Sequence, residues 1–203
     1  MYLTVKRMLD ILLALILLVP ATLLVGICAL AIKIESKDPA FFVQERPGHK
    51  GEIFRIYKLR TMVIDTERDG KTLTDMDRIT KTGKVIRKLS FDELPQIWNI
   101  LCGQMSFIGP RPLLTSYLPL YTAEQMRRHD VLPGISGWAQ VNGRNEISWE
   151  QKFRQDVWYV DNVSFIADLK IFWRTILSVV KREGINSEVN NTMQIFSGEN
   201  TSA

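Results

Sequence analysis

Two adjacent carboxylic acids stand in the stretch Ser90-Phe91-Asp92-Glu93. A hydroxyl residue followed three positions later by Glu is the capping-box pattern, which closes the first turn of a helix. At a helix N-terminus the backbone N–H groups and the helix dipole stabilise an ionised carboxylate and also attract phosphate. The stretch therefore predicts either a purely structural cap or an ionised Asp92 that can attack a phosphoryl group.

Adjacent acids on a helix point about 100° apart, because one turn holds about 3.6 residues. This geometry is poor for a glycosidase, whose two acids must flank one bond. It suits a single nucleophile, Asp92, with Glu93 as a neighbour that binds metal or handles a proton.

Three arginines are candidates for the positive charge that a phosphate site needs. Arg87 precedes the acids, Arg111 lies within Gly109-Pro110-Arg111-Pro112, and Arg144 follows the Asn142-Gly143 turn. The prolines restrict the backbone around Arg111 and so lower the cost of presenting its guanidinium to phosphate. Each arginine alone fits a surface residue or an ion-pair partner equally well.

The composition limits the class of protein. The 203-residue chain has a formal net charge of +4, which suits an anionic membrane surface or a phosphate-bearing substrate. No nucleic-acid motif accompanies this small excess, so nucleic acid is not an expected partner. Cys28 and Cys102 form no CxxC pair, which favours a reducing cytosol over a disulfide framework. His49 and His129 lack a neighbouring ligand cluster, so zinc is not expected.

The acids must be positioned by a chain that begins with an apolar segment. The segment from Ile11 to Ile32 carries no charged side chain and is long enough for a helix to cross a bilayer. Pro20 lies near its middle and should kink the helix. Basic residues flank both ends of the segment, namely Lys6, Arg7, Lys33 and Lys37. A spanning helix usually has its basic residues mainly on one side of the membrane. A re-entrant helix broken at Pro20 and a kinked spanning helix therefore both remain open, and Asp10 could pair with Lys6 and Arg7 at helical spacing.

The rest of the chain predicts a mainly helical domain with short β segments. We divide the chain into a membrane helix over 1–35, a compact cytoplasmic catalytic domain over 36–185 and a polar, flexible tail over 186–203. Short strands are expected at 41–43 and 53–57, and a helix is expected to start at Ser90. We interpret 68–82 and 133–137 as loops.

Two helical segments are expected near the end of this domain. The first covers 148–159, from the spacing of its apolar residues. The second carries an apolar stripe formed by Leu169, Phe172, Ile176 and Val179. That stripe predicts either packing in the core or an amphipathic helix lying on a membrane surface.

Several longer motifs occur together with the acids. They are Lys6-Arg7-x-x-Asp10, Gln44-Glu45-Arg46-Pro47-Gly48, Tyr57-Lys58-Leu59-Arg60-Thr61-Met62, Ser90-Phe91-Asp92-Glu93-Leu94-Pro95-Gln96, Met105-Ser106-Phe107-Ile108-Gly109-Pro110-Arg111-Pro112 and the run from Pro133 to Asn145. With these motifs the chain resembles the small monotopic phosphoglycosyl transferases of the bacterial sugar transferase family, over nearly its whole length.

The resemblance implies a two-step reaction on the cytoplasmic face of the bacterial inner membrane. Asp92 would attack the sugar-bearing phosphate of a UDP-sugar, release UMP and hold the phosphosugar covalently. Polyprenyl (undecaprenyl) phosphate would then accept the phosphosugar, which initiates glycoconjugate or glycoprotein glycan synthesis. Mg²⁺ would bind Asp92 and the substrate phosphates, and Glu93 would complete the catalytic pair.

The resemblance also implies further site residues and partners. Arg87, Arg111 and Arg144 match phosphate-binding positions, and Lys58 is a further match. Additional polar site residues would be Asp156, Gln140 and Asn142. The family's N-terminal helix is re-entrant, which favours that topology here, in contact with membrane lipid. Relatives of this length commonly use N-acetylated UDP-sugars, so the expected donor is UDP-N,N'-diacetylbacillosamine or another N-acetylated UDP-sugar, and a homo-oligomer remains open.

Two other classes of function use the same residues. A membrane-bound hydrolase of nucleotide sugars or lipid phosphates would employ the carboxylates with water as the acceptor. A non-catalytic membrane adaptor would use the capped helix and the arginines as structure alone.

Overall fold

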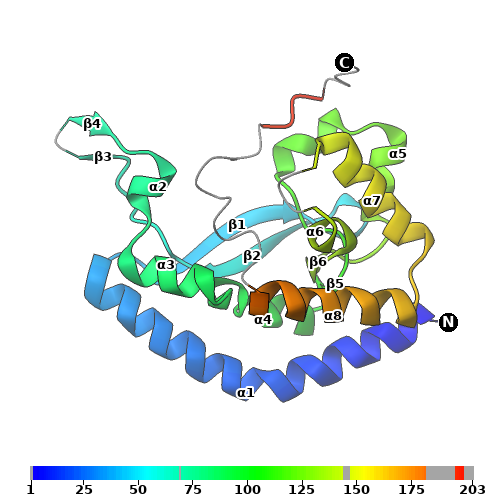
Figure 1. Cartoon of the computed structure of the whole chain (residues 1–203), viewed down its shortest axis with the longest axis horizontal. Coiled ribbons are helices and arrows are strands. Elements are labelled where there is room, and N and C mark those ends of the chain that lie inside the picture. The colour runs from blue at the N-terminus through cyan, green and yellow to red at the C-terminus, as the bar shows by residue number, and fades with distance from the viewer. Residues whose placement is uncertain (1, 69, 144–146, 182–194, 199–203) are drawn as a thin grey trace.

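The computed structural model describes residues 2–68, 70–143, 147–181 and 195–198. Its longest element is the helix α1 (Tyr2–Ser36), which contains Pro20. Figure 1 shows α1 bent near its middle, with the remaining elements on the inner side of the bend. Proline lacks the amide hydrogen that would continue the helical ladder, so the bend has a local cause at Pro20. The expected kink is thus present as a bend within one continuous helix.

The N-terminal arm of α1 is fixed to the domain by buried polar groups. Lys6 Nζ lies 2.8 Å from an Asp168 carboxylate oxygen on helix α8, and 4.0 Å from Asp10. The Asp10 carboxylate accepts hydrogen bonds from Ser106 Oγ at 2.8 Å and from the Phe107 amide at 3.2 Å. The predicted Lys6–Asp10 pairing is present, but Asp168 is the closer partner of Lys6.

The C-terminal arm of α1 is held by the same domain. The Glu35 carboxylate accepts hydrogen bonds from the backbone amides of Lys81 and Thr82, both at 2.8 Å. Because those amides begin a helix, the Glu35 carboxylate satisfies donors that the helix itself leaves unpaired. Both ends of α1 therefore contact one body of the protein.

α1 also shares its apolar core with the domain. Ala14 and Ala21 pack with Phe54, Ile97 and Ile100, and Ile32 packs in a second cluster. Most of the large apolar side chains on the other face of α1 are exposed. This helix is long and apolar enough to cross a membrane. Small residues at its inner face allow the close approach that this packing requires.

An antiparallel hairpin forms the centre of the molecule. Strand β1 (Phe41–Pro47) pairs with β2 (Ile53–Leu59) around the turn η1 (His49–Gly51), which confirms both predicted strands. Phe42 lies opposite Lys58, and Arg46 lies opposite Phe54. Since side chains alternate between the faces of a strand, Phe42, Gln44, Arg46 and Lys58 lie on one face of the hairpin.

The prediction of a loop over 68–82 was wrong. This region contains the short pair β3 (Glu67–Arg68) and β4 (Lys71–Thr72), helix α2 (Asp75–Arg78) and the start of α3 (Lys81–Lys88). Thr74 and Thr80 cap the two helices through their hydroxyls. Capping hydroxyls can start helices within a polar sequence, which a search for apolar periodicity does not detect.

The predicted capping box at Ser90 was also wrong. Ser90 adopts a left-handed conformation with φ 56°, and its side chain makes no capping hydrogen bond. Residues Phe91–Glu93 form the single 3₁₀ turn η2, and the α-helix α4 starts later, at Gln96–Leu101. Pro95 lies between them as the residue preceding α4, where its missing amide leaves no hydrogen bond unmade.

The loop prediction for 133–137 was wrong in part. Strand β6 (Gly134–Ser136) pairs in parallel with β5 (Ser106–Ile108), and helix α6 (Trp138–Val141) follows. Gly134 lies so close to the Gly109 segment that an added Cβ would be 2.1 Å from the Gly109 nitrogen. Glycine is required here by the approach of two backbones.

Short helical turns connect β5 to β6, namely η3 (Thr115–Leu120), α5 (Ala123–Met126) and η4 (Arg127–His129). The expected helix over 148–159 is confirmed as α7 (Trp149–Asp161), with Ser148 as its capping residue. Phe196, which falls within the predicted tail, is 7% exposed and packs against Tyr117, Phe153 and Trp149. Part of the predicted 186–203 tail is thus docked on the domain.

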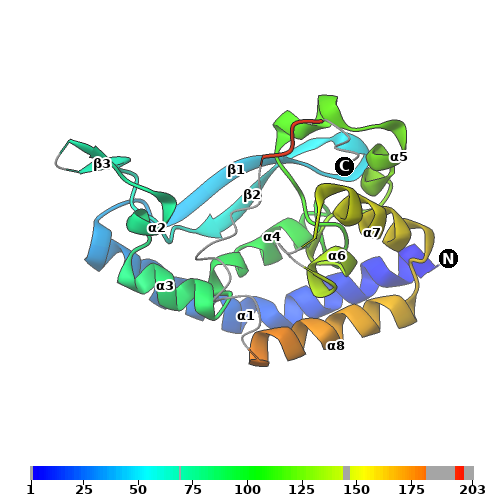
Figure 2. The same cartoon turned by 45° about the horizontal axis from the view of Figure 1, so that its top comes forward.

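The last helix, α8 (Phe165–Lys181), runs beside the N-terminal arm of α1 (Figures 1 and 2). Ile171 and Ala167 face the core, whereas the predicted apolar stripe is exposed: Leu169, Phe172, Ile176 and Val179. The core-packing interpretation of this stripe was therefore wrong.

Candidate active site

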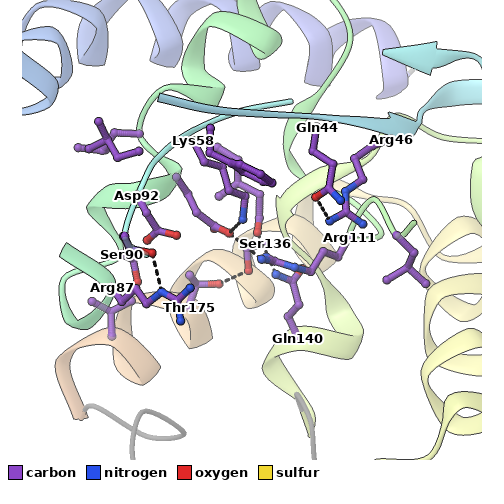
Figure 3. Close-up of a pocket in the computed structure, with 18 of the residues that line it drawn as sticks. Gln44, Arg46, Lys58, Arg87, Ser90, Asp92, Arg111, Ser136, Gln140 and Thr175 are labelled. Atoms are coloured by element: carbon purple, nitrogen blue, oxygen red, sulfur yellow. Dashed lines mark hydrogen bonds and ion pairs between the residues drawn. The ribbon is translucent and has the colours of Figure 1, made fainter. Parts of the chain in front are cut away.

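A cavity of about 1060 Å³ lies between the β1–β2 hairpin, the η2 turn, α6 and α8. Both acids line it, together with Lys58, Arg87 and Arg111. In Figure 3, Asp92 and Arg87 lie on one side of the cavity, and Arg46 and Arg111 lie on the other. The structure thus brings together residues that are far apart in the sequence and that were predicted to share a site.

Glu93 is bound by two cations. One carboxylate oxygen, Oε1, accepts hydrogen bonds from Lys58 Nζ at 2.9 Å and from Arg111 Nη2 at 2.7 Å. Burial alone would raise the pKa of Glu93, but the charges and hydrogen bonds of Arg111 and Lys58 outweigh it and lower that pKa to about 2. Glu93 is therefore a fixed anion at neutral pH.

Asp92 has a different environment, although it is the adjacent residue. Within the part of the chain that the structure describes, no group donates a hydrogen bond to its carboxylate. Burial and the neighbouring Glu93 raise the pKa of Asp92, against the opposing effect of Lys58, Arg111 and Arg87. The prediction that a helix start would stabilise ionised Asp92 was wrong, because no capped helix begins there.

The raised pKa of Asp92, and the absence of a hydrogen-bond donor to it among the described residues, distinguish this acid from Glu93. A carboxylate without hydrogen bonds keeps its lone pairs available to attack phosphorus or to bind a cation. Glu93 has one oxygen already occupied by two donors, so the two acids have different environments.

The arginines are held in position by neutral groups and by a second ion pair. Arg87 Nε donates to Thr61 Oγ1 at 2.8 Å. Arg128 donates to the main-chain oxygen of Arg111 at 2.7 Å and also binds the Asp156 carboxylate at 2.8 Å. Arg128 and Asp156 are almost fully buried, with side chains 1% and 3% exposed. Asp156 borders the cavity, but its carboxylate serves to hold Arg128.

Three other predicted site residues differ in whether they line the cavity. Gln140 lines the cavity and donates from Nε2 to the Ile135 oxygen at 2.9 Å. Asn142 does not line the cavity; it donates to the Trp138 oxygen and accepts from Arg174. Arg144 lies outside the described residues.

Sequence reasoning missed several cavity residues. Arg46 lies on the same face of the hairpin as Lys58, and strand alternation within the Gln44–Gly48 motif could have placed it there. Lys152 on α7 also lines the cavity, where burial, with Arg111 and Arg128 nearby, lowers its pKa to about 8 although Asp156 acts in the opposite direction. Ser136 and Thr175 share a hydrogen bond of 2.6 Å across the cavity wall (Figure 3). Nothing in the local sequence identifies these last two residues.

A metal would have to be held by few protein ligands. Across residues 2–68, 70–143, 147–181 and 195–198, no group of three His, Cys, Asp or Glu side chains could hold one. Mg²⁺ often binds one or two carboxylates and completes its coordination with substrate phosphates and water. The Asp92 carboxylate, which accepts no protein hydrogen bond there, fits that manner of binding. Two further acids near the cavity have protein partners: Asp77 takes part in the capping box of α2 with Thr74, and Asp75 pairs with Arg78.

Known proteins resemble this chain along most of its length. The family model described as bacterial sugar transferase matches residues 1–182. A Bacillus subtilis (strain 168) protein named uncharacterized sugar transferase EpsL is 50% identical over 193 residues, which cover 95% of this chain and 96% of that protein.

Two further relatives have names that state an activity. An Aeromonas hydrophila UDP-N-acetylgalactosamine-undecaprenyl-phosphate N-acetylgalactosaminephosphotransferase is 41% identical over 188 residues, covering 88% of this chain and 44% of its own. A Caulobacter vibrioides UDP-glucose:undecaprenyl-phosphate glucose-1-phosphate transferase is 40% identical over 187 residues, covering 86% and 69%. This chain thus spans less than half of the Aeromonas protein and nearly all of the Bacillus one. The chain belongs to the bacterial sugar transferase family and is a phosphoglycosyl transferase.

Proposed function

We propose that this enzyme transfers a sugar 1-phosphate from a UDP-sugar to polyprenyl (undecaprenyl) phosphate and releases UMP. The observation that carries the proposal is the contrast between the two acids. Asp92 faces a cation-lined cavity with no hydrogen-bond donor from the described chain, whereas Glu93 is bound by Lys58 and Arg111. Two relatives whose names include a sugar phosphate transferred to undecaprenyl phosphate support the same reaction class.

The proposed chemistry has two balanced steps. An Asp92 carboxylate oxygen attacks the phosphorus that carries the sugar, the bond from that phosphorus to the bridging oxygen breaks, and UMP leaves with the electron pair. A phosphate oxygen of the polyprenyl phosphate then attacks the same phosphorus, which releases the Asp92 carboxylate and forms a polyprenyl diphosphate sugar. Neither step requires an oxidant, and the Asp92 anion is regenerated.

The surrounding cations supply electrostatic stabilisation. Arg87, Lys58 and Arg111 surround the Asp92–Glu93 pair and would balance the charge of the diphosphate as it is cleaved. A Mg²⁺ ion held by Asp92 and the substrate phosphates would neutralise further negative charge. Glu93 keeps Lys58 and Arg111 in place and remains anionic, so we assign it a supporting role beside the nucleophile.

A test of the proposal separates it from the two alternatives. Purified protein with radiolabelled UDP-sugar and no acceptor should release one equivalent of UMP and retain the sugar phosphate covalently, and Asp92→Asn should abolish both. UMP with free sugar phosphate would indicate the hydrolase, and release of UDP would contradict attack at phosphorus. An Asp92→Asn protein that complements a deletion strain fully would support the adaptor.

The membrane arrangement is part of the same proposal. Because both arms of α1 are bound to one domain, we propose that α1 enters and leaves the membrane at the cytoplasmic face. The exposed apolar residues of α8, which runs beside α1, would lie in the interface of the same leaflet. This places the Asp92 cavity near the surface from which a lipid phosphate must approach.

The donor sugar is proposed only as a class. The relatives quoted above are named for N-acetylgalactosamine and for glucose, so membership of the family admits different sugars. Measuring UMP release from a panel of UDP-sugars, including UDP-N,N'-diacetylbacillosamine, would identify the donor.

A further inference from the structure

A second, much smaller void lies beside Glu93. Its volume is about 30 Å³, and it is bordered by Glu93, by both cations that bind this acid, and by Arg46 and Gln96. Asp92 does not border it. The void therefore contacts the supporting acid without contacting the proposed nucleophile.

Gln96 is the polar residue that this arrangement leaves unexplained. It is the first residue of α4 and is 2% exposed, yet its Nε2 amide has no hydrogen-bond partner among the described residues. A buried donor without a partner costs about 1–3 kcal/mol, so buried amides are almost always satisfied by protein or by ordered water. The void beside Gln96 is the place where such a partner would fit.

The size and lining of the void favour one water molecule. A cavity needs roughly 10–15 Å³ of probe-occupied volume and two to four polar partners to hold a water. A halide would satisfy the donors, but it would face the Glu93 carboxylate and be repelled by it. Water can accept from the Gln96 amide and donate to the carboxylate, so it satisfies both kinds of group.

We propose that an ordered water in this void links the Gln96 side-chain amide to the Glu93 carboxylate, which makes Gln96 a positioning residue for Glu93. This role rests on the proposed function of the Asp92–Glu93 pair, but the water site itself does not. Glu93 has two oxygens, and Lys58 and Arg111 both donate to Oε1. A third donor from the Gln96 side would limit rotation of the carboxylate and keep both cations aligned toward the cavity.

Two variants test the proposal. Gln96→Met keeps the length of the side chain but removes the donor, and Gln96→Glu places a second carboxylate at the void. We expect Gln96→Met to lower kcat of UMP release about tenfold with little change in KM, because Gln96 does not line the substrate cavity. Repulsion by the added carboxylate should move the acidic limb of the Gln96→Glu pH–rate profile to higher pH. The matched control is Gln155→Met, since Gln155 also has a buried amide atom without a partner among the described residues but lines neither cavity.

A crystal structure tests the water site independently of enzyme activity. Density for one water within hydrogen-bonding distance of Gln96 Nε2 and of a Glu93 oxygen, lost in Gln96→Met, would support the site. A dry void, or replacement of the density by bromide in a soaked crystal, would overturn it. Unchanged kcat and pH profiles in both variants would overturn the positioning role. Absence of transferase activity in the native protein would instead count against the proposed function while leaving the water test intact.

Discussion

Arg128 donates a hydrogen bond of 2.7 Å to the main-chain oxygen of Arg111, and this contact joins the buried part of the domain to the active site. Arg128 is itself held by Asp156, and the Arg111 guanidinium binds Glu93. Asp156 on α7 is therefore connected to the proposed catalytic pair through three successive contacts. Asp156 is best understood as part of this support rather than as a group that contacts substrate.

The first prediction concerns this support. Asp156→Asn should destabilise the protein by about 3–5 kcal/mol, because it leaves the charge of Arg128 buried without its partner. UMP release should fall as the Arg111 segment loosens. Asp161→Asn is the control, since Asp161 lies on the same helix and pairs with Arg127 at the surface. Its expected effect is below about 1 kcal/mol. Equal chemical denaturation curves for the two variants would contradict the proposed importance of the buried pair.

The second prediction concerns the pH dependence of UMP release. The proposed reaction needs ionised Asp92, whose pKa is raised by burial and by Glu93. The rate should therefore fall as pH decreases through a value above the ordinary Asp range of about 3.9. Glu93, with a pKa of about 2, should not contribute a limb in the accessible range. The measurement is kcat/KM for UMP release between about pH 4 and 8, and a flat profile down to the ordinary Asp range would exclude a raised Asp92 pKa.

The third prediction concerns stability and has opposite signs for the two acids. A carboxyl group with a raised folded-state pKa stabilises the fold at low pH, and that contribution is lost as pH rises through the folded pKa. Ionised Asp92 is therefore unfavourable at pH 7, and Asp92→Asn should raise Tm. Glu93 has a lowered pKa, so its contribution is present above its unfolded pKa and is lost progressively as pH falls from there through the folded pKa of about 2. Glu93→Gln should lower stability at pH 7 by about 1–3 kcal/mol. Thermal unfolding at pH 7 checks both signs, and a lower Tm for Asp92→Asn would be inconsistent with its assigned environment.

The fourth prediction concerns the topology of α1. Cysteines introduced at Leu3 and at Lys37, in a background without Cys28 and Cys102, should be labelled from the same side of sealed vesicles. Labelling from opposite sides would show a spanning helix instead. Pro20→Leu restores the missing backbone donor, and it should shift part of the population to opposite-side labelling.

The fifth prediction concerns the exposed face of α8. Ile166→Glu should weaken binding of the protein to anionic vesicles, because Ile166 is an apolar residue of α8 that is 77% exposed. Ile195→Glu is a matched control, because Ile195 is 80% exposed and belongs to the segment 195–198, which is drawn in red in Figure 1 and lies away from α1 and α8. Flotation with vesicles measures both variants, and equal losses would indicate a general charge effect.

Local patterns in the sequence identified the elements with strong periodicity. The apolar run with Pro20, the strands around Gly48 and the helix capped by Ser148 were all confirmed. Contacts between residues that lie far apart in the chain could not be predicted, because no local pattern shows that Arg128 contacts Arg111 or that Thr175 contacts Ser136. Those contacts depend on the path of the backbone between the elements.

The Ser90–Glu93 stretch shows how two acids can be assigned to one cavity although the local structure expected for them was wrong. The capping-box pattern was present, but Ser90 took a left-handed conformation and Glu93 was bound by Lys58 and Arg111 instead. Tertiary ion pairs outweighed the local capping preference. The assignment of both acids to one site therefore rested on the longer motifs, which reflect the whole site rather than a single turn.

The register of the β1–β2 hairpin has a consequence for how this family can vary in length. Side chains on one face of a strand are separated by an even number of positions. This alternation places Arg46 on β1 and Lys58 on β2 on the hairpin face that lines the cavity. One residue inserted within either strand would turn the side chains beyond it to the opposite face. A change in length at the turn 49–51 would leave the phase of both strands intact. We therefore expect natural insertions and deletions to accumulate at that turn, while the two strands keep a constant length.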